Sequence, residues 1–207
     1  MLSSARHLTA PIRRAPARLA VAIGLKPHHI TWTSLFVAGV AAYILAEHHF
    51  LVGFAVASLA AGLDFVDGEV ARMTHRVTLR GGYLDSLIDR AVDALLLVSV
   101  LWAYNDRVLW AIGAVALVGT QATSYAKARV YESRQPNPEV WKKDLLERAD
   151  RYLIFLPALL AQAVADMAHK TWPILPWAIA VLAALSLVTV LQRARTAWRI
   201  LEEPGGQ

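Results

Sequence analysis

The sequence predicts an all-α integral membrane protein with six transmembrane helices and an N-terminal amphipathic helix at the membrane interface. Of the 207 residues, 57% are hydrophobic and 18% are charged, and the mean hydropathy is +0.42. The hydrophobic share is above that of soluble domains and the charged share is below it. Apolar segments of about 17–25 residues recur along the chain, the length that crosses a hydrocarbon core of about 30 Å.

Charge and cysteine content narrow the function further. The net charge of +5 and a pI near 9.7 are compatible with nucleic-acid binding. In a chain this apolar, basic loops beside a membrane explain the charge better, so we expect no nucleic-acid partner. The chain contains no cysteine, which excludes disulfides, thiolate metal sites and thiol redox motifs.

The N-terminal segment, residues 2–25, alternates short apolar runs with arginines. We expect it to lie on the membrane surface as an amphipathic helix, interrupted at Pro11. It lacks the apolar core and cleavage site of a secretory signal. Its arginines are Arg6, Arg13, Arg14 and Arg18.

Six apolar spans follow. Pro27 suits the first turn of a helix and predicts the start of the first span. A polar loop at 73–80 and a tight turn at Gly81-Gly82 are expected to separate the second and third spans. The predicted spans are about 30–46, 50–72, 83–103, 108–130, 150–168 and 174–192.

The cationic residues predict the orientation of these spans. An even number of spans puts both termini on one side, and 19 of the 21 Lys and Arg residues fall on that side. Only Arg107 and Lys170 fall on the other. The positive-inside rule therefore predicts a multi-pass protein of the cell membrane with cytoplasmic termini.

Four aspartates stand out because they interrupt apolar sequence. Asp64 and Asp67 are three residues apart, and Asp85 and Asp89 are four apart, so each pair shares one helix face. Carboxylates are costly in a membrane unless they bind a ligand or face water. Crowded carboxylates also repel one another unless a cation or a shared proton offsets the charge. An all-oxygen ligand set suits Mg²⁺, Mn²⁺ or Ca²⁺.

Two functions fit such a cluster. One is a proton or cation pathway through a transporter, and the other is a metal-dependent enzyme acting on a diphosphate-bearing lipid. Transporters usually place their charges near the membrane midplane, whereas these aspartates lie at the cytoplasmic ends of their spans, which favours the enzyme. Gly68 leaves the helix surface bare for a bulky ligand such as a nucleotide, and Arg72 is placed to meet a phosphate.

The full spacing resembles the signature of the CDP-alcohol phosphotransferase family. The matching pattern is Asp64-x-x-Asp67-Gly68-x-x-Ala71-Arg72, eight residues, then Gly81-x-x-x-Asp85-x-x-x-Asp89. The length and the expected helices also agree, so the resemblance implies one membrane domain over residues 1–207. It further implies a homodimer.

The resemblance implies a reaction and roles for residues. The phosphate-linked alcohol group of a CDP-alcohol would pass to an acceptor hydroxyl with release of CMP. Asp64, Asp67 and Asp85 would bind two Mg²⁺ or Mn²⁺ ions, with Asp89 nearby as a further ligand and as the general base. The CDP-lipid would contact His28, Thr31, Gly68, Ala71, Arg72, Thr78 and Gly81. His28 departs from the family, which commonly has Asn or Asp there.

A second cluster bears on the acceptor. Seven polar or cationic residues near three predicted cytoplasmic helix ends suit a phosphorylated acceptor, because arginine binds phosphate bidentately; positive-inside decoration explains some of them equally well. They are Ser124, Lys127, Arg129, Arg148, Arg151, Arg193 and Arg195. The surrounding sequences are similar to prokaryotic phosphatidylinositol-phosphate synthases and archaetidylinositol-phosphate relatives, which implies inositol 1-phosphate as acceptor and a CDP-linked lipid as donor. Glycerol 3-phosphate or serine as acceptor, or CDP-inositol as donor, remain alternatives.

Overall fold

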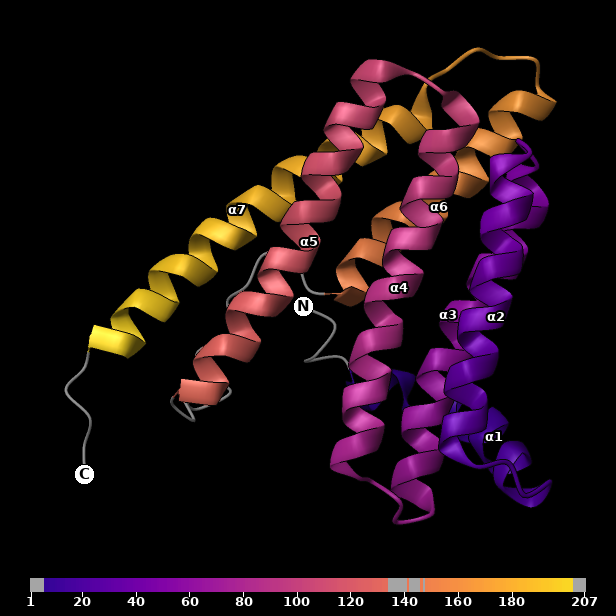
Figure 1. Cartoon of the computed structure of the whole chain (residues 1–207). Coiled ribbons are helices and arrows are strands. Elements are labelled where there is room, and N and C mark those ends of the chain that lie inside the picture. Colours follow the sequence, from indigo (N-terminus) through magenta and orange to yellow (C-terminus); the bar gives the residue numbers. More distant parts are fainter. Residues whose placement is uncertain (1–5, 134–140, 142–145, 147, 203–207) are drawn as a thin grey trace. The chain divides into compact units, whose positions relative to one another are not determined.

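The structure is a computed structural model that describes residues 6–133, 141, 146 and 148–202, with side chains from residue 14 onward and again from 150. The described part is helical throughout and contains no strand (Figure 1). Its seven helices are α1 (Arg6–Ala22), α2 (Pro27–Ala46), α3 (Phe50–Met73), α4 (Leu79–Tyr104), α5 (Arg107–Ser133), α6 (Arg148–Met167) and α7 (Ile174–Glu202).

The helices form two compact units. The first contains residues 1–104 and 159–172, and therefore α1 to α4 with the end of α6. The second contains residues 105–158 and 173–207, and therefore α5, the start of α6 and α7. The boundary inside α6 lies next to Pro157, which has no N–H to donate to the helix.

In the first unit, α2 packs against both α3 and α4. Small residues line the contact: α2 buries Ala38, Ala41 and Ala42, and α3 buries Gly53 and Ala57. A Cβ on Gly53 would lie 2.3 Å from Leu45 Cδ2, so a larger residue there would force the Leu45 side chain to shift. Close approach through small residues is the usual way in which membrane helices associate. The helix α2 thus holds together the two helices that carry the aspartates.

In the second unit, α5 packs against α7 in the same manner. A Cβ on Gly119 of α5 would lie 2.3 Å from Ser186 Oγ of α7. Nearer the C-terminal ends of α5 and α7, buried Arg193 of α7 donates a hydrogen bond to the carbonyl oxygen of Thr123 of α5. This bond joins α7 to α5 and satisfies part of a guanidinium that is only 8% exposed.

The helix starts and ends agree with most of the predicted boundaries. The start of α2 at Pro27 is confirmed. The predicted turn at Gly81-Gly82 is wrong, because both glycines lie inside α4, which already begins at Leu79. The reason is local: Thr78 Oγ1 accepts a hydrogen bond of 3.0 Å from the N–H of Gly81 and so caps α4 ahead of the glycines.

The interruption at Pro11 is also wrong, since α1 runs through it without a break. Proline removes one backbone hydrogen bond near the start of a helix. The rest of α1 is held by contact with α3, and tertiary packing of this kind stabilises a helix more than local propensity does.

Four of the six predicted spans are long and apolar enough to cross a membrane: α2, α3, α5 and α7. The remaining two, α4 and α6, are helices of 26 and 20 residues that carry at least three charged residues in every 18-residue window. In α4 these charges include the predicted site residues Asp85 and Asp89. Large apolar side chains are exposed on several helices, for example Phe36, Trp102 and Trp177 at about 70%, which suits contact with lipid rather than water.

Candidate metal centre

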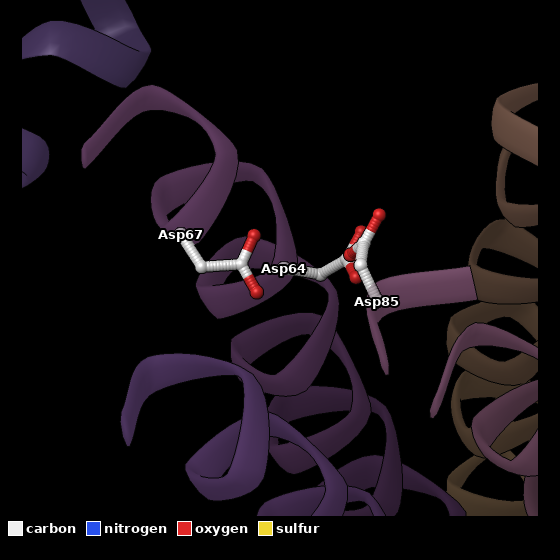
Figure 2. Close-up of side chains that lie close together, drawn as sticks. All are labelled: Asp64, Asp67 and Asp85. Atoms are coloured by element: carbon white, nitrogen blue, oxygen red, sulfur yellow. The ribbon is translucent and has the colours of Figure 1, made fainter. Parts of the chain in front are cut away.

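Three of the four predicted aspartates meet at one point. Oxygens of Asp64, Asp67 and Asp85 all lie within 4.8 Å of one another. Figure 2 shows Asp64 and Asp67 reaching from α3, and Asp85 from α4, into the same space. Asp67 is 4% exposed, and the other two are half-buried. Three carboxylates held this closely repel one another unless a cation lies between them.

The donor set fits a divalent cation. Carboxylate oxygens alone suit Mg²⁺ or Mn²⁺, which take oxygen ligands at about 2.0–2.2 Å and accept water in their remaining positions. Half-buried Asp64 and Asp85 leave the site accessible to such water or to a ligand. Asp89, one helical turn beyond Asp85, is half-buried and is not part of the three-carboxylate group in the described residues.

The buried aspartate has a partner on α2. Thr31 Oγ1 lies 2.7 Å from Asp67 Oδ2 and 3.0 Å from the carbonyl oxygen of Pro27. A hydroxyl has one proton to donate, and the shorter contact goes to the carboxylate. A hydrogen bond to a metal-binding carboxylate fixes its orientation and tunes its affinity. Thr31 therefore orients the Asp67 carboxylate by donating a hydrogen bond to it, a role that the sequence did not reveal.

We expect Thr31→Val to weaken metal binding by about tenfold, because loss of such a partner costs roughly 10–100-fold in affinity. Valine has nearly the same shape but no hydroxyl. The measurement is the Mn²⁺ dissociation constant of the purified protein, taken from the rise in its unfolding temperature on titration with Mn²⁺. Thr31→Ser keeps the hydroxyl and should behave like the unmodified chain. Equal Mn²⁺ dependence of the valine and serine variants would contradict this role.

The predicted donor-site residues other than Thr31 make local contacts, on α3 and at the starts of α2 and α4. Gly68 and Ala71 are half-buried on α3, and the Arg72 guanidinium lies 3.6 Å from where a Gly68 Cβ would be. Arg72 pairs with Glu69, its Nη2 lying 2.7 Å from Oε2. The Thr78 and Gly81 pair forms the cap of α4, and His28 is exposed with its ring edge-on to His29 at 4.2 Å. Their contacts with a CDP-lipid stay predictions.

The described members of the predicted acceptor cluster all belong to the second unit. Arg193 donates a hydrogen bond to the carbonyl oxygen of Thr123, and Arg129 forms an ion pair with Glu132. Ser124 Oγ lies 3.4 Å from the Thr120 carbonyl oxygen. Of the others, Lys127 and Arg151 are half-buried and Arg195 is exposed. The side chain of Arg148 lies outside the described residues. Convergence of the cluster on an acceptor stays a prediction.

Sequence reasoning missed how Glu69 is used. Its carboxylate is 18% exposed and faces both Arg72 of its own helix and Arg14 of α1. The i, i+3 spacing of Glu69 and Arg72 was a visible signal for their pair. Nothing in the local sequence signalled Arg14, because its approach depends on how α1 docks.

Comparison with known proteins decides the family. A family model described as CDP-alcohol phosphatidyltransferase matches residues 25–144, which include all four aspartates and α2. This chain belongs to the CDP-alcohol phosphatidyltransferase family. Within this family, the archaetidylinositol phosphate synthase of Methanothermobacter thermautotrophicus is 33% identical over 195 residues, 92% of each chain. The phosphatidylinositol phosphate synthase of Streptomyces avermitilis is 34% identical, covering 82% of this chain and 71% of the relative.

Solved structures agree with this family member along nearly its whole length. The phosphatidylinositol phosphate synthase of Mycobacterium tuberculosis with CDP-DAG bound matches with a TM-score of 0.79 at 26% identity, covering 95% of this chain and 100% of the other. The same enzyme in complex with manganese and citrate matches with a TM-score of 0.78 at 27% identity, covering 92% of each chain.

Proposed function

We propose that this family member transfers the phosphatidyl-type group of a CDP-linked lipid to the hydroxyl of inositol 1-phosphate, releasing CMP. The observation that carries the proposal is the group formed by Asp64, Asp67 and Asp85 within the family signature. The relatives named as archaetidylinositol and phosphatidylinositol phosphate synthases support the choice of acceptor. Carboxylates grouped at one end of their helices support an enzyme over the transporter alternative.

The reaction breaks a phosphoanhydride bond of the CDP-linked lipid and forms a phosphodiester bond to the acceptor. The acceptor oxygen bonds to the phosphorus that carries the lipid, and the bond from this phosphorus to the oxygen of CMP breaks. The acceptor proton passes to Asp89, which follows Asp85 by one turn of α4 and is not a member of the group formed by Asp64, Asp67 and Asp85 in the described residues. CMP leaves as the second product, so no oxidant, reductant or further substrate is needed.

Asp64, Asp67 and Asp85 would hold Mg²⁺ or Mn²⁺, and the manganese complex of the mycobacterial relative supports this assignment. When bound, two ions would neutralise charge on the diphosphate and on the departing CMP. Thr31 orients Asp67 for this purpose. Gly68, Ala71 and Arg72 would receive the nucleotide, as the family signature implies, and the mycobacterial relative binds CDP-DAG.

The membrane arrangement is part of the proposal. We infer six spans, α2 to α7, with α1 on the cytoplasmic surface and both termini in the cytoplasm. The four apolar helices support the spans. The placement of Lys and Arg supports the orientation. Leu19 of α1 and Ile23, directly after the end of α1, are each 65% exposed while Ala17 and Ala20 are buried, an arrangement that suits a helix with one face in lipid and one on protein. A homodimer is expected from the family.

The test is one panel with the purified, full-length protein. CDP-diacylglycerol or CDP-archaeol is combined with inositol 1-phosphate, glycerol 3-phosphate or serine, and CMP release is measured with and without Mn²⁺. We expect the fastest release with inositol 1-phosphate. Faster CMP release with glycerol 3-phosphate or serine would show that this compound is the acceptor, while the proposed reaction type would stand. Absence of metal-dependent CMP release with every pair would refute the enzyme.

Replacing Arg195 with glutamine should raise the acceptor KM by about tenfold or more, with little effect on the KM for the CDP-lipid. The guanidinium is exposed and can form charge-assisted hydrogen bonds with the acceptor phosphate; loss of one such bond costs roughly tenfold in affinity. Arg199→Gln, one turn further along α7, is the matched control. An equal rise in both KM values for Arg195→Gln would argue against a role in acceptor binding.

A further inference from the structure

A basic pocket lies between α1 and α3. It has a volume of about 350 Å³ and is lined by Arg14 and Arg18 of α1 and by Glu69, Arg72 and Met73 of α3. Three guanidinium groups and one carboxylate give this lining a formal charge of +2. All five residues belong to the first unit.

Docking of α1 creates the pocket. Ala17 and Ala20 are buried in a cluster with Ile30 and Val70, and Ala17 is 0% exposed. The small side chain at position 17 allows α1 to lie close to α3. Arg14 and Arg18 lie three residues before and one residue after Ala17, and their spacing of four places both on the same face of α1. They therefore flank the contact and reach toward the end of α3.

Glu69 organises the arginines without cancelling their charge. Its Oε2 accepts from Arg72 Nε at 3.2 Å and Nη2 at 2.7 Å, and its Oε1 lies 4.0 Å from Arg14 Nε. Arg72 thereby uses two of its five N–H groups on Glu69 and keeps three for another acceptor. The side chains of Arg14 and Arg72 are 62% and 58% exposed, so their guanidinium groups are accessible to a ligand.

The pocket lies on a different face of α3 from Asp67 of the metal centre. Glu69 and Met73 follow Asp67 by two and six residues, which places them roughly 120–160° from it around the helix. A ligand in the pocket therefore faces the surface helix rather than the buried carboxylate. Arg72 is the residue that the pocket shares with the predicted donor site.

We propose that this pocket binds the phosphate-bearing headgroup of an anionic phospholipid, as a second lipid site distinct from that of the CDP-linked substrate. Guanidinium groups bind phosphate oxygens bidentately through charge-assisted hydrogen bonds. The thioether chain of Met73 supplies an apolar wall for the part of the lipid next to the phosphate. The helix α1, with Leu19 exposed on it and Ile23 exposed directly after its end, would lie at headgroup depth.

The test measures thermal unfolding of the full-length protein in neutral detergent during titration with phosphatidylglycerol. A ligand that binds only the folded state, at free concentration L, adds RT ln(1 + L/Kd) to the free energy of unfolding. The dependence of the unfolding temperature on lipid concentration therefore gives Kd, the half-saturating concentration. For Arg14→Gln/Arg18→Gln we expect the half-saturating phosphatidylglycerol concentration to rise at least about tenfold, because each lost charged hydrogen bond costs roughly that factor. Arg107→Gln, a cation at the start of α5 outside the pocket, should leave it unchanged.

Three comparison arms separate the sources of a phosphate. An equal response of the double variant and the unmodified chain to phosphatidylglycerol would overturn the site. An equal rise in unfolding temperature with phosphatidylcholine or with inorganic phosphate would refute the assignment of an anionic lipid headgroup as the ligand. A rise in unfolding temperature with CDP-diacylglycerol alone that depends on Arg14 and Arg18 would show that the pocket belongs to the donor site. The proposal of a second lipid site would then be overturned. None of these arms depends on turnover, so they are independent of the proposed reaction.

A second variant covers the case in which the double glutamine change prevents folding. Arg14→Lys/Arg18→Lys keeps the charge and the long side chains but loses the bidentate geometry. The half-saturating phosphatidylglycerol concentration should still rise severalfold relative to the unmodified chain. An unchanged value would show that the arginines do not contact the headgroup and would overturn the proposal.

Discussion

Replacing Asp89 with asparagine should lower kcat for CMP release by about 10²–10⁴-fold, the range that a positioned general base contributes. Asparagine keeps the size of the side chain but cannot accept the acceptor proton. Because Asp89 lies outside the group of Asp64, Asp67 and Asp85, Mn²⁺ affinity should stay within about threefold of the original, a change small beside the tenfold that one lost charged bond costs. Initial rates at saturating Mn²⁺ and both substrates, together with a Mn²⁺ titration, test both parts.

A neighbouring carboxylate provides the control for Asp89. Asp93 lies one turn further along α4 and is also half-buried, so Asp93→Asn makes the same chemical change on the same helix. Its turnover should be close to that of the unmodified chain. Near-normal turnover of Asp89→Asn would refute its role as base. A loss of Mn²⁺ affinity that accounts for the loss of turnover would instead assign Asp89 as a metal ligand.

Replacing Asp85 with asparagine should reduce CMP release at least roughly a hundredfold at low Mn²⁺, because metal stabilisation of a transition state amounts to several kcal/mol. Part of the activity should return at higher Mn²⁺, since two of the three carboxylates remain. Asp85 is the residue of choice because it alone supplies the α4 side of the group. The measurement is CMP release as a function of Mn²⁺ concentration.

The same variant has a second readout that separates metal loss from misfolding. Removing one of three crowded charges relieves repulsion, so metal-free Asp85→Asn should unfold at a higher temperature than the metal-free original. The rise in unfolding temperature on adding Mn²⁺ should shrink in the variant. Asp106→Asn is the control, because asparagine also caps a helix and Asp106 accepts from the N–H of Leu109 at the start of α5. A metal-free Asp85→Asn that is less stable than the original would contradict crowding of the carboxylates.

The helices and their approximate ends could be predicted from the sequence because the relevant signals are local. Apolar runs bounded by Pro27 and by short polar turns mark the helices, and the structure places their ends within a few residues of the prediction except for α7, which continues ten residues past the predicted end at 192 to Glu202. Two local predictions were wrong, at Pro11 and at Gly81-Gly82. In both, a contact prevailed over an intrinsic preference: α1 is held by α3, and α4 is capped by Thr78.

The spacing of the aspartates likewise predicted a carboxylate cluster suited to a divalent cation, although spacing alone left both an enzyme and a transporter open. Asp64 with Asp67, and Asp85 with Asp89, could each be assigned to one helix face from sequence alone. The family match agrees with this assignment. Periodicity within a helix cannot say which members of two pairs meet, because that depends on the angle and offset at which the helices lie.

Tertiary structure decided this choice and the partners of the site. It brings Asp85 to Asp64 and Asp67 and leaves Asp89 outside the group. It places Thr31 against Asp67, 36 residues away in the chain, because α2 packs on α3. It also brings Arg14 to Glu69 through the docking of Ala17. Each of these contacts joins different helices, and their geometry follows from how small side chains let the helices approach, which local sequence patterns do not specify.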